Sequence, residues 1–471
     1  MIRSATFTSL VLLASVAVAQ LPQSVYLIDS NSVSGGNPQG RRVFRFNSDG
    51  SLIGTVDNPY SGNFIGPSST NLNQTPLICA PRIVNGQEKL LISNQGGTIS
   101  QFSATGVFES TFISGLDNPR GISLGPDGYY YIAEGNTNRI RRFRQDGTEA
   151  GDFASGVTSC WYVLHRRNGD KLISRSTTVS GGATPQVERW SAGGAFLGNF
   201  ATGYAFTQQM AELDNGNVLV CVFSPNSGAF AKADGLYEFT STGTEVLRYD
   251  TPGARGVVVL TNGNYLSTGG TNVVEHVPGN PIGNVRIGFG GTVGPNASNF
   301  RMLYRHRYYT ANVNVTLGQF DFGDVTTQPV TVQLRHVPSG NIVDTQTLTL
   351  DASGNASFQT LYSGDGMFQL YIKASHWLTK AVPLNLGPAT ATVTATLTNG
   401  DVDGDNLVSI LDYLKVSAYY ELDSSASNWN TPDSDGVKPS SADLDGDGVV
   451  SILDYIIVST NYELAGDDPT S

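Results

Sequence analysis

Residues 118–153 read NPRGISLGPDGYYYIAEGNTNRIRRFRQDGTEAGDF, and this stretch shows the pattern that organises most of the chain. Two tight turns, PDG and QDG, separate short runs rich in Ile, Tyr and Phe. Aromatic and β-branched residues favour strands, whereas Asp and Gly favour the turns between strands. The stretch therefore predicts a small antiparallel sheet of four short strands.

Both turns recur through the first part of the chain. The glycine of the first turn recurs, with spacings of 42, 41, 47 and 47 residues, at Gly86, Gly128, Gly169, Gly216 and Gly263. The glycine of the second turn recurs at Gly50, Gly106, Gly147, Gly194 and Gly243. Four strands in each repeat of about 45 residues are typical of a β-propeller blade. We count six repeats and expect a six-bladed β-propeller.

The first repeat is incomplete. VYLID, RVFRF and SLIGTV predict three strands and leave the innermost strand missing. After the sixth repeat, residues 299–306 read NFRMLYRH. We expect this segment to complete the first blade and to close the ring, because closure removes open sheet edges.

Residues 118–153 also resemble an NHL repeat, since Asn138-Arg139-Ile140 stands before the third predicted strand. The resemblance implies an NHL-like propeller over residues 20–306. Some six-bladed relatives are lactonases or lyases that place carboxylate, Asn or His groups around the channel. Glu134 and Asn136 are candidates for that role, although the NHL pattern by itself accounts for both.

The pattern changes over residues 307–398, where apolar and polar residues alternate between SG, ASGN and SGDG turns. This alternation predicts an antiparallel β-sandwich. The segments LTLDASGNASFQTL and FQLYIKASHWL resemble a carboxypeptidase-regulatory-like or Cna-B-like domain. That resemblance implies a spacer.

Two acidic loops follow: DVDGDNLVSILDY at 401–413 and DLDGDGVVSILDY at 443–455. Calcium takes six to eight oxygen ligands, and a 12-residue loop offers them from positions 1, 3, 5, 7, 9 and 12. Position 6 needs a left-handed turn, and Asn406 and Gly448 suit it. We expect two Ca²⁺ ions, with the carbonyl oxygen as the ligand at position 7. The predicted ligands are Asp401, Asp403, Asp405, Leu407, Ser409 and Asp412 in the first loop, and Asp443, Asp445, Asp447, Val449, Ser451 and Asp454 in the second.

Each acidic loop runs directly into an apolar helix, and position 12 is Asp instead of Glu. A duplicated loop–helix unit of this kind resembles a type I dockerin, here over residues 399–466 with a tail at 467–471. The resemblance implies a cohesin-like partner recognised at loop positions 10 and 11, which are Ile410-Leu411 and Ile452-Leu453. The chain's own sandwich domain is the alternative partner for these four apolar residues.

The charge lies almost entirely in this module. From Asp401 onward the chain has 15 acidic and two basic residues, a net charge of −13, whereas the whole chain has −12. The other residues are close to neutral and show no basic patch, which argues against nucleic-acid binding. The composition favours a mainly β protein, and the two loop–helix units add a small α-helical calcium-binding module.

Residues 1–19 place Arg3 before an apolar run that ends in Ala17-Val18-Ala19. This pattern predicts a secretory signal and a secreted or cell-surface protein. No later stretch is long and apolar enough to predict a membrane span. Cys79, Cys160 and Cys221 allow one disulfide, but their spacing does not choose a pair, and three buried thiols are the alternative.

The sequence shows no catalytic motif. Eight positions before the first-turn glycines stand Arg120, Trp161, Gln208 and Arg255, which we expect near one mouth of the propeller channel, where they could bind an anion or a sugar. We therefore expect a noncatalytic binding protein with the propeller as its recognition element for a glycan or a peptide. The alternative is a carbohydrate-active or lactonase-like enzyme recruited to a polysaccharide-degrading assembly. A third interpretation gives the loop pair a structural role as a calcium-stabilised cap.

Overall fold

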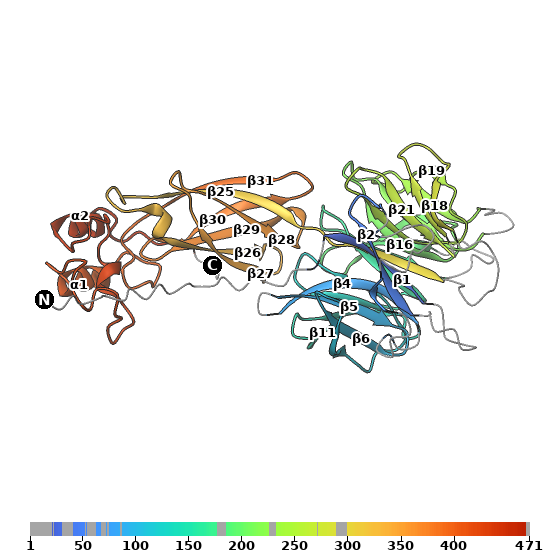
Figure 1. The fold of residues 1–471 in the computed structure, drawn as a ribbon, viewed down its shortest axis with the longest axis horizontal. Helices are drawn as coiled ribbons and strands as arrows, with labels where there is room; N and C mark the ends of the chain where they lie inside the picture. The colour runs from blue at the N-terminus through green and yellow to red at the C-terminus, as the bar shows by residue number, and fades with distance from the viewer. Residues whose placement is uncertain are drawn as a thin grey trace, which may run out of the picture.

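The computed structural model describes residues 21–467 except residues 22, 31–40, 52, 54–62, 67–71, 73–74, 85–86, 177–184, 226–231, 271 and 289–298. The protein is mainly β and elongated, with three parts in a row (Figure 1). A ring of sheets lies at one end, two packed sheets lie in the middle, and two short helices lie at the other end.

The ring consists of six four-stranded sheets. The first has the order β24-β1-β2-β3, with β1 (Ser24–Asp29), β2 (Arg42–Asn47), β3 (Asn63–Ile65) and β24 (Phe300–Arg305). The second and third contain β4 (Pro76–Val84), β5 (Gln87–Asn94), β6 (Thr98–Ser103) and β7 (Phe108–Ile113), then β8 (Pro119–Leu124), β9 (Tyr130–Glu134), β10 (Arg139–Phe143) and β11 (Glu149–Ser155). The fourth and fifth contain β12 (Cys160–His165), β13 (Lys171–Arg175), β14 (Pro185–Trp190) and β15 (Phe196–Thr202), then β16 (Thr207–Glu212), β17 (Val218–Val222), β18 (Gly235–Phe239) and β19 (Glu245–Tyr249). The sixth contains β20 (Ala254–Val259), β21 (Tyr265–Gly269), β22 (Asn272–His276) and β23 (Asn284–Gly288).

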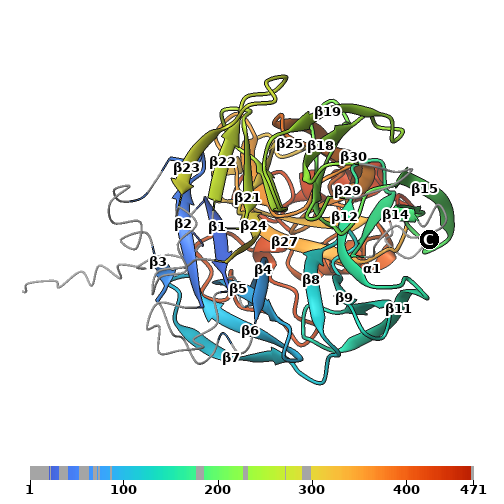
Figure 2. The same ribbon diagram turned by 90° about the vertical axis from the view of Figure 1, so that its right-hand side faces the viewer.

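The ring is closed by β24, as the sequence predicted. Strand β24 pairs antiparallel with β1, so that Leu27 lies opposite Leu303 and Val25 lies opposite Arg305. The strands β4, β8, β12, β16, β20 and β24 contact one another in turn around the axis (Figure 2). The outermost strand of the first sheet is β3, whereas the SLIGTV segment that we expected there lies mostly outside the described residues.

The recurring glycine of the second turn has a packing reason. Gly106 and Gly243 have φ angles of 82° and 95°, a left-handed conformation that favours glycine. A Cβ atom at either position would collide with a carbonyl oxygen of the preceding sheet's outer strand, at Phe64 or Phe200. Glycine therefore lets each hairpin lie directly against its neighbouring blade.

The middle part is a β-sandwich of two sheets. One has the order β28-β25-β31 and the other β27-β26-β29-β30. Their strands are β25 (Tyr309–Leu317), β26 (Pro329–His336), β27 (Ile342–Thr349), β28 (Asn355–Thr360), β29 (Gly364–Ala374), β30 (Lys380–Leu386) and β31 (Ala391–Leu397). The prediction of an antiparallel sandwich is wrong for one pair, because β25 and β31 run parallel. Alternate residues of β25 and β31 are buried, and the core between the sheets includes the fully buried Trp377. This alternation explains the period-2 pattern of the sequence.

The last part contains α1 (Ile410–Ala418) and α2 (Ile452–Thr460), each preceded by an acidic loop. Both helices begin with the same capping box. Ser409 and Asp412 form it at α1, and Ser451 and Asp454 form it at α2. Such boxes satisfy backbone N–H groups that no helical carbonyl reaches. Residues on both loops and both helices share one small apolar core, which includes Val408, Val416, Val450 and Val458.

The structure also bears on the cysteines and on possible membrane-spanning helices. Cys79, Cys160 and Cys221 are buried free thiols, so no disulfide joins them here. Among the described residues, no helix combines the length and the apolar composition that crossing a membrane requires.

Candidate calcium loops and ligand-binding faces

Each acidic loop gathers three carboxylates. Oxygen atoms of Asp401, Asp403 and Asp405 lie within 4.8 Å of one another, and the same holds for Asp443, Asp445 and Asp447. Ligands that share one Ca²⁺ ion at 2.3–2.6 Å must lie about this close together. These six are the predicted ligands of positions 1, 3 and 5.

The turn at position 6 has the expected backbone. Asn406 and Gly448 have φ angles of 69° and 86°. These angles direct the backbone N–H groups inward, where Asn406 donates to Asp401 and Gly448 donates to Asp443. The sequence prediction of a left-handed residue at both positions is therefore confirmed.

The predicted ligands at positions 7, 9 and 12 form other interactions within the protein. The carboxylates of Asp412 and Asp454 are buried and accept backbone N–H groups of their own loops, including those of Val402 and Leu444. Ser409 and Ser451 are N-cap residues whose Oγ atoms accept from Leu411 and Leu453. The backbones of Leu407 and Val449 form isolated bridges with residues outside their loops. The assignment of these six residues as ligands stays a prediction.

Burial and crowding raise the pKa of several loop carboxyls. Burial and the neighbouring Asp454 carboxylate raise the pKa of Asp443 to about 7. Burial, followed by the Asp412 carboxylate, also raises the pKa of Asp403. The Oδ2 atom of Asp445 is buried and has no hydrogen-bond partner in the described part of the chain. A divalent cation would give this orphaned oxygen a partner and would balance the crowded charges, so the residues present fit calcium.

The sandwich supports both loops from one side. The Phe322 N–H of the sandwich donates to the Asp445 carbonyl at 3.0 Å, while Asn399 Nδ2, at the start of the C-terminal module itself, donates to the Leu444 carbonyl at 2.7 Å. At the first loop, Thr379 N–H donates to Asn406 Oδ1 at 2.8 Å. The bonds from Phe322 and Thr379 hold one point of each loop against the sandwich and leave the outer faces of the helices free.

The four predicted partner-binding residues lie on those outer faces. Ile410, Leu411, Ile452 and Leu453 are 54%, 52%, 59% and 43% exposed. They are thus neither the module's own core nor covered by the sandwich, which contacts the loops instead. The structure adds Leu414 and Ile456, which are 56% and 54% exposed. The sequence could have indicated both, because they stand one helical turn after Ile410 and Ile452.

The four residues predicted at the channel mouth occupy equivalent places. Arg120, Trp161, Gln208 and Arg255 are the second residues of β8, β12, β16 and β20. The Arg120 guanidinium lies 4.7 Å from the Trp161 ring centroid, whereas Gln208 is buried. Arg255 instead stacks on Phe223 at 3.6 Å. The structure therefore brings Arg120 and Trp161 together and gives Arg255 a separate aromatic partner.

Sequence reasoning missed Arg301, which is the second residue of the closing strand β24 and therefore occupies an equivalent position. Burial and the nearby Arg301 lower the pKa of Arg255 to about 9. The signal was available, since NFRMLYRH was already assigned to the innermost strand. A ligand at this mouth stays a prediction.

Glu134 and Asn136 have other partners. Glu134 Oε2 accepts from Thr137 Oγ1 at 2.7 Å and from Arg139 Nε at 2.8 Å, and Glu134 Oε1 accepts from Arg141 at 3.0 Å. Asn136 Nδ2 donates to Asp117 at 2.9 Å. Both residues thus hold the turn of their own blade, in agreement with the NHL pattern.

Comparisons with known proteins add the following similarities. The family model of the dockerin type I domain matches residues 399–461. No curated protein matches the chain. A type II cohesin–X–dockerin complex from Acetivibrio cellulolyticus has a chain that is 16% identical, with a TM-score of 0.26, and the match covers 34% of this chain and 97% of that one.

Two other solved structures are similar to a larger part of the chain. A chain of a nidogen/laminin complex is 11% identical with a TM-score of 0.44, over 59% of this chain and 97% of that one. Virginiamycin B lyase from Staphylococcus aureus is 13% identical with a TM-score of 0.35, over 56% of this chain and 84% of that one. The clearest of these findings for the candidate site is that the dockerin match spans both acidic loops and both helices.

Proposed function

We propose that the C-terminal module attaches this protein to a cohesin-like partner when its loops hold calcium. The observation that carries the proposal is the pair of equivalent loop–helix units, each of which exposes an Ile-Leu pair next to its acidic loop. Exposed apolar side chains on a strongly acidic module are unfavourable in water unless a partner covers them. The match to the dockerin type I model over residues 399–461 supports a cohesin as that partner.

We propose that calcium binding at the loops controls the helices that carry the partner-binding residues. In the metal-bound module the loops would be held by Asp401, Asp403, Asp405 and their counterparts, and helix α1 starts only five residues after Asp405. Because metal binding and folding are coupled when ligands repel one another, calcium would set the orientation of both helices. We propose two ions, one for each loop.

We propose that the C-terminal module attaches the propeller and the sandwich to the partner. We assign residues 20–306 to a propeller that acts as a noncatalytic recognition element, residues 307–398 to a sandwich spacer and residues 399–466 to the dockerin-like module. Residues 1–19 support export from the cell, and a glycan or a peptide is the ligand class proposed for the propeller. The short gap between β24, which ends at Arg305, and β25, which begins at Tyr309, supports the first boundary.

The test uses the whole chain and a set of type I cohesins. Isothermal titration calorimetry with calcium should detect binding to at least one cohesin, and chelation of calcium should abolish it. Asp405→Ala with Asp447→Ala, which removes a side-chain oxygen ligand from each loop, should also abolish binding. The matched control, Asp423→Ala with Asp435→Ala, removes the same groups from the segment between the loops and should retain it. Binding that survives chelation would disprove the calcium-dependent attachment.

A further inference from the structure

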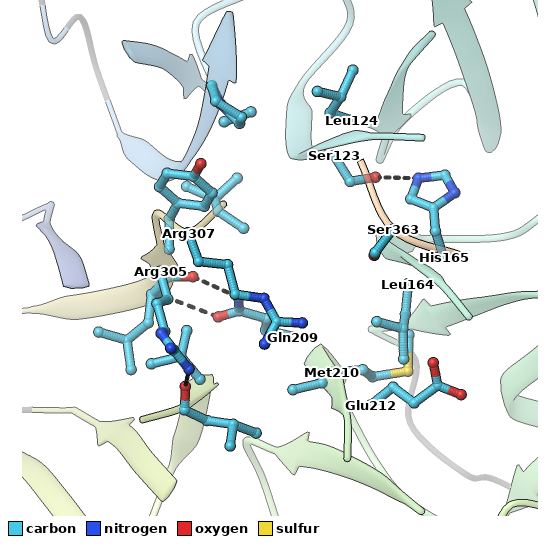
Figure 3. A pocket seen from close by; sticks show the side chains of 18 of the residues that line it. Ser123, Leu124, Leu164, His165, Gln209, Met210, Glu212, Arg305, Arg307 and Ser363 are labelled. Atoms are coloured by element: carbon cyan, nitrogen blue, oxygen red, sulfur yellow. Dashed lines mark hydrogen bonds between the residues drawn. The ribbon is translucent and has the colours of Figure 1, made fainter. Parts of the chain in front are cut away.

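A cavity lies on the axis of the propeller, where the ring meets the sandwich (Figure 3). Its volume is about 280 Å³, and all six innermost strands line it. The sandwich closes one side with Tyr309, Leu361, Tyr362 and Ser363. Ligand pockets usually measure about 300–1,000 Å³, so this cavity suits a molecule of about the size of one sugar ring.

The contact between ring and sandwich is specific. Asp365 N–H donates to the Arg167 carbonyl at 2.8 Å, and Asn341 Nδ2 donates to the Asp127 carbonyl at 2.9 Å. Gln145 Nε2 reaches Tyr362 Oη at 3.3 Å. These hydrogen bonds come from two adjacent blades, the third and the fourth, and hold the sandwich over this end of the channel.

Positive charge gathers on one side of the cavity. Arg305 and Arg307 lie on that side, opposite Ser123, His165 and Glu212 (Figure 3). Arg305 bonds the Val259 carbonyl at 2.5 Å, and Arg307 Nε bonds Tyr309 Oη at 2.6 Å. Both partners are neutral. Within the described residues, neither arginine forms an ion pair with a carboxylate.

Of the two carboxylates among the described residues that line the cavity, Glu212 and Asp214, the first is already compensated. Glu212 Oε1 accepts from Arg166 Nε at 3.2 Å, and Glu212 Oε2 accepts from the Arg167 N–H at 2.8 Å. Arg305 has a buried Nε–H for which the described chain offers no acceptor. Burial and then the charge of Arg307 lower the pKa of Arg305, while Tyr309 and the Asp214 carboxylate act in the opposite direction. A partly buried arginine without an ion-pair partner is stabilised by an accompanying anion.

The other residues that line the cavity indicate the chemical character of the rest of the ligand. Ile122, Leu164 and Val257 supply apolar surface, while Ser123 and Ser363 supply hydroxyl groups. Ser123 Oγ is 3.0 Å from His165 Nε2. Burial lowers the pKa of His165 well below its usual value, so this ring is neutral and leaves the positive charge to the arginines. Neutral hydroxyl and imidazole groups are suited to the hydroxyl groups of a ligand.

We propose that this cavity binds a small hydroxylated organic anion, with its carboxylate or phosphate group held by Arg305 and Arg307. The site differs from the channel mouth at Arg120 and Arg255, which lies at the opposite end of the innermost strands. It uses no residue of the calcium loops, so its success or failure is independent of cohesin binding.

The test is isothermal titration calorimetry on the full calcium-loaded chain. The probes are gluconate, glucuronate, glucose 6-phosphate, inorganic phosphate and acetate, with glucose as the uncharged counterpart. We expect binding of a hydroxylated anion and none of glucose, and the comparison of gluconate with glucose 6-phosphate separates a carboxylate from a phosphate ligand. Arg305→Gln and Arg307→Gln should each weaken binding about tenfold or more, since each removes a charged hydrogen-bond donor.

Arg144→Gln is the matched control, because Arg144 is an exposed residue on the outer part of a blade and does not line the cavity. It should bind as the wild type does. Hydrogen exchange gives a second measurement that requires no variant. The bound ligand should slow exchange in residues 361–363 and 209–212, which line the cavity. Binding of none of these anions at millimolar concentration, or equal binding by wild type and both cavity variants, would overturn the proposal.

Discussion

Lys373 Nζ, on strand β29 of the sandwich, bonds the buried carboxylate of Asp401, the first residue of the first acidic loop. The equivalent residue of the second loop, Asp443, accepts only backbone N–H groups among the bonds that the structure shows, from Gly446 and Gly448 at 3.1 Å each. The two loops are alike in sequence, yet a cation of the neighbouring domain reaches only the first. This difference should make their calcium affinities unequal.

Lys373→Gln should strengthen calcium binding at the first loop several-fold, because the lysine charge competes with the metal for the same oxygen. Calorimetric titration of the full chain should resolve two sites, of which only one changes. Lys380→Gln is the control. It removes the same charge from β30, where Lys380 pairs with Asp467 at 3.3 Å outside the loops. Unchanged or weaker calcium binding in the Lys373 variant would contradict the competition.

The calcium-free module should lose stability as the pH rises. The folded structure raises the pKa of Asp443 to about 7 from its usual 3.8, so the folded state holds a proton that the unfolded state releases. Between these two values the folded state binds more protons, and the free energy of unfolding therefore falls with increasing pH.

Chelated protein should therefore show less protection of α1 and α2 from hydrogen exchange at about pH 8 than at about pH 5. With saturating calcium, protection should be greater at the higher pH than at the lower pH, because protons compete with the metal for the same carboxylates. Asp443→Asn should reduce the pH dependence of the chelated protein. Equal protection at both pH values without calcium would show that crowding of the loop carboxyls does not affect folding.

Replacing Ile410, Leu411, Ile452 and Leu453 by Ser should weaken cohesin binding while calcium binding stays nearly unchanged. None of the four supplies a ligand side chain, and each is about half exposed in the free protein. Burial of an aliphatic side chain contributes roughly 1–2 kcal/mol, so the total loss should reach several kcal/mol. Val107→Ser with Ile282→Ser, which changes two apolar residues that are 63% and 76% exposed on the propeller, is the control. Full binding by the four-Ser variant would place the partner surface elsewhere.

Gln209 should be important for ring stability. Its Nε2 donates to the Leu303 carbonyl at 2.6 Å, and its Oε1 accepts from Leu303 N–H at 2.9 Å and from Val257 N–H at 3.1 Å. The side chain thereby joins β16 to β20 and to the closing strand β24. Gln209→Leu leaves buried backbone groups without partners, at about 1–3 kcal/mol for each group. Thermal melting should show a clear loss of stability, whereas Gln87→Leu at an exposed position should melt as the wild type does.

The sequence determined the features that depend on short segments. The turn glycines at a regular period predicted the blades, because each four-stranded sheet forms from neighbours in the chain. Asp401 to Asp412 and Asp443 to Asp454 predicted the acidic loops for the same reason, since one continuous segment supplies all the groups. The one long-range feature that sequence predicted, closure by Phe300–Arg305, followed from the strand that the first blade lacked.

Only the tertiary structure decided which residues from distant segments meet. Lys373 and Asp401 are 28 residues apart and belong to different domains, and no local pattern links them. The cavity around Arg305 and Arg307 exists because residues 361–363 of the sandwich close the end of the channel. Side-chain packing and domain contact set such relationships, and neither the periodicity nor the composition of the chain records them.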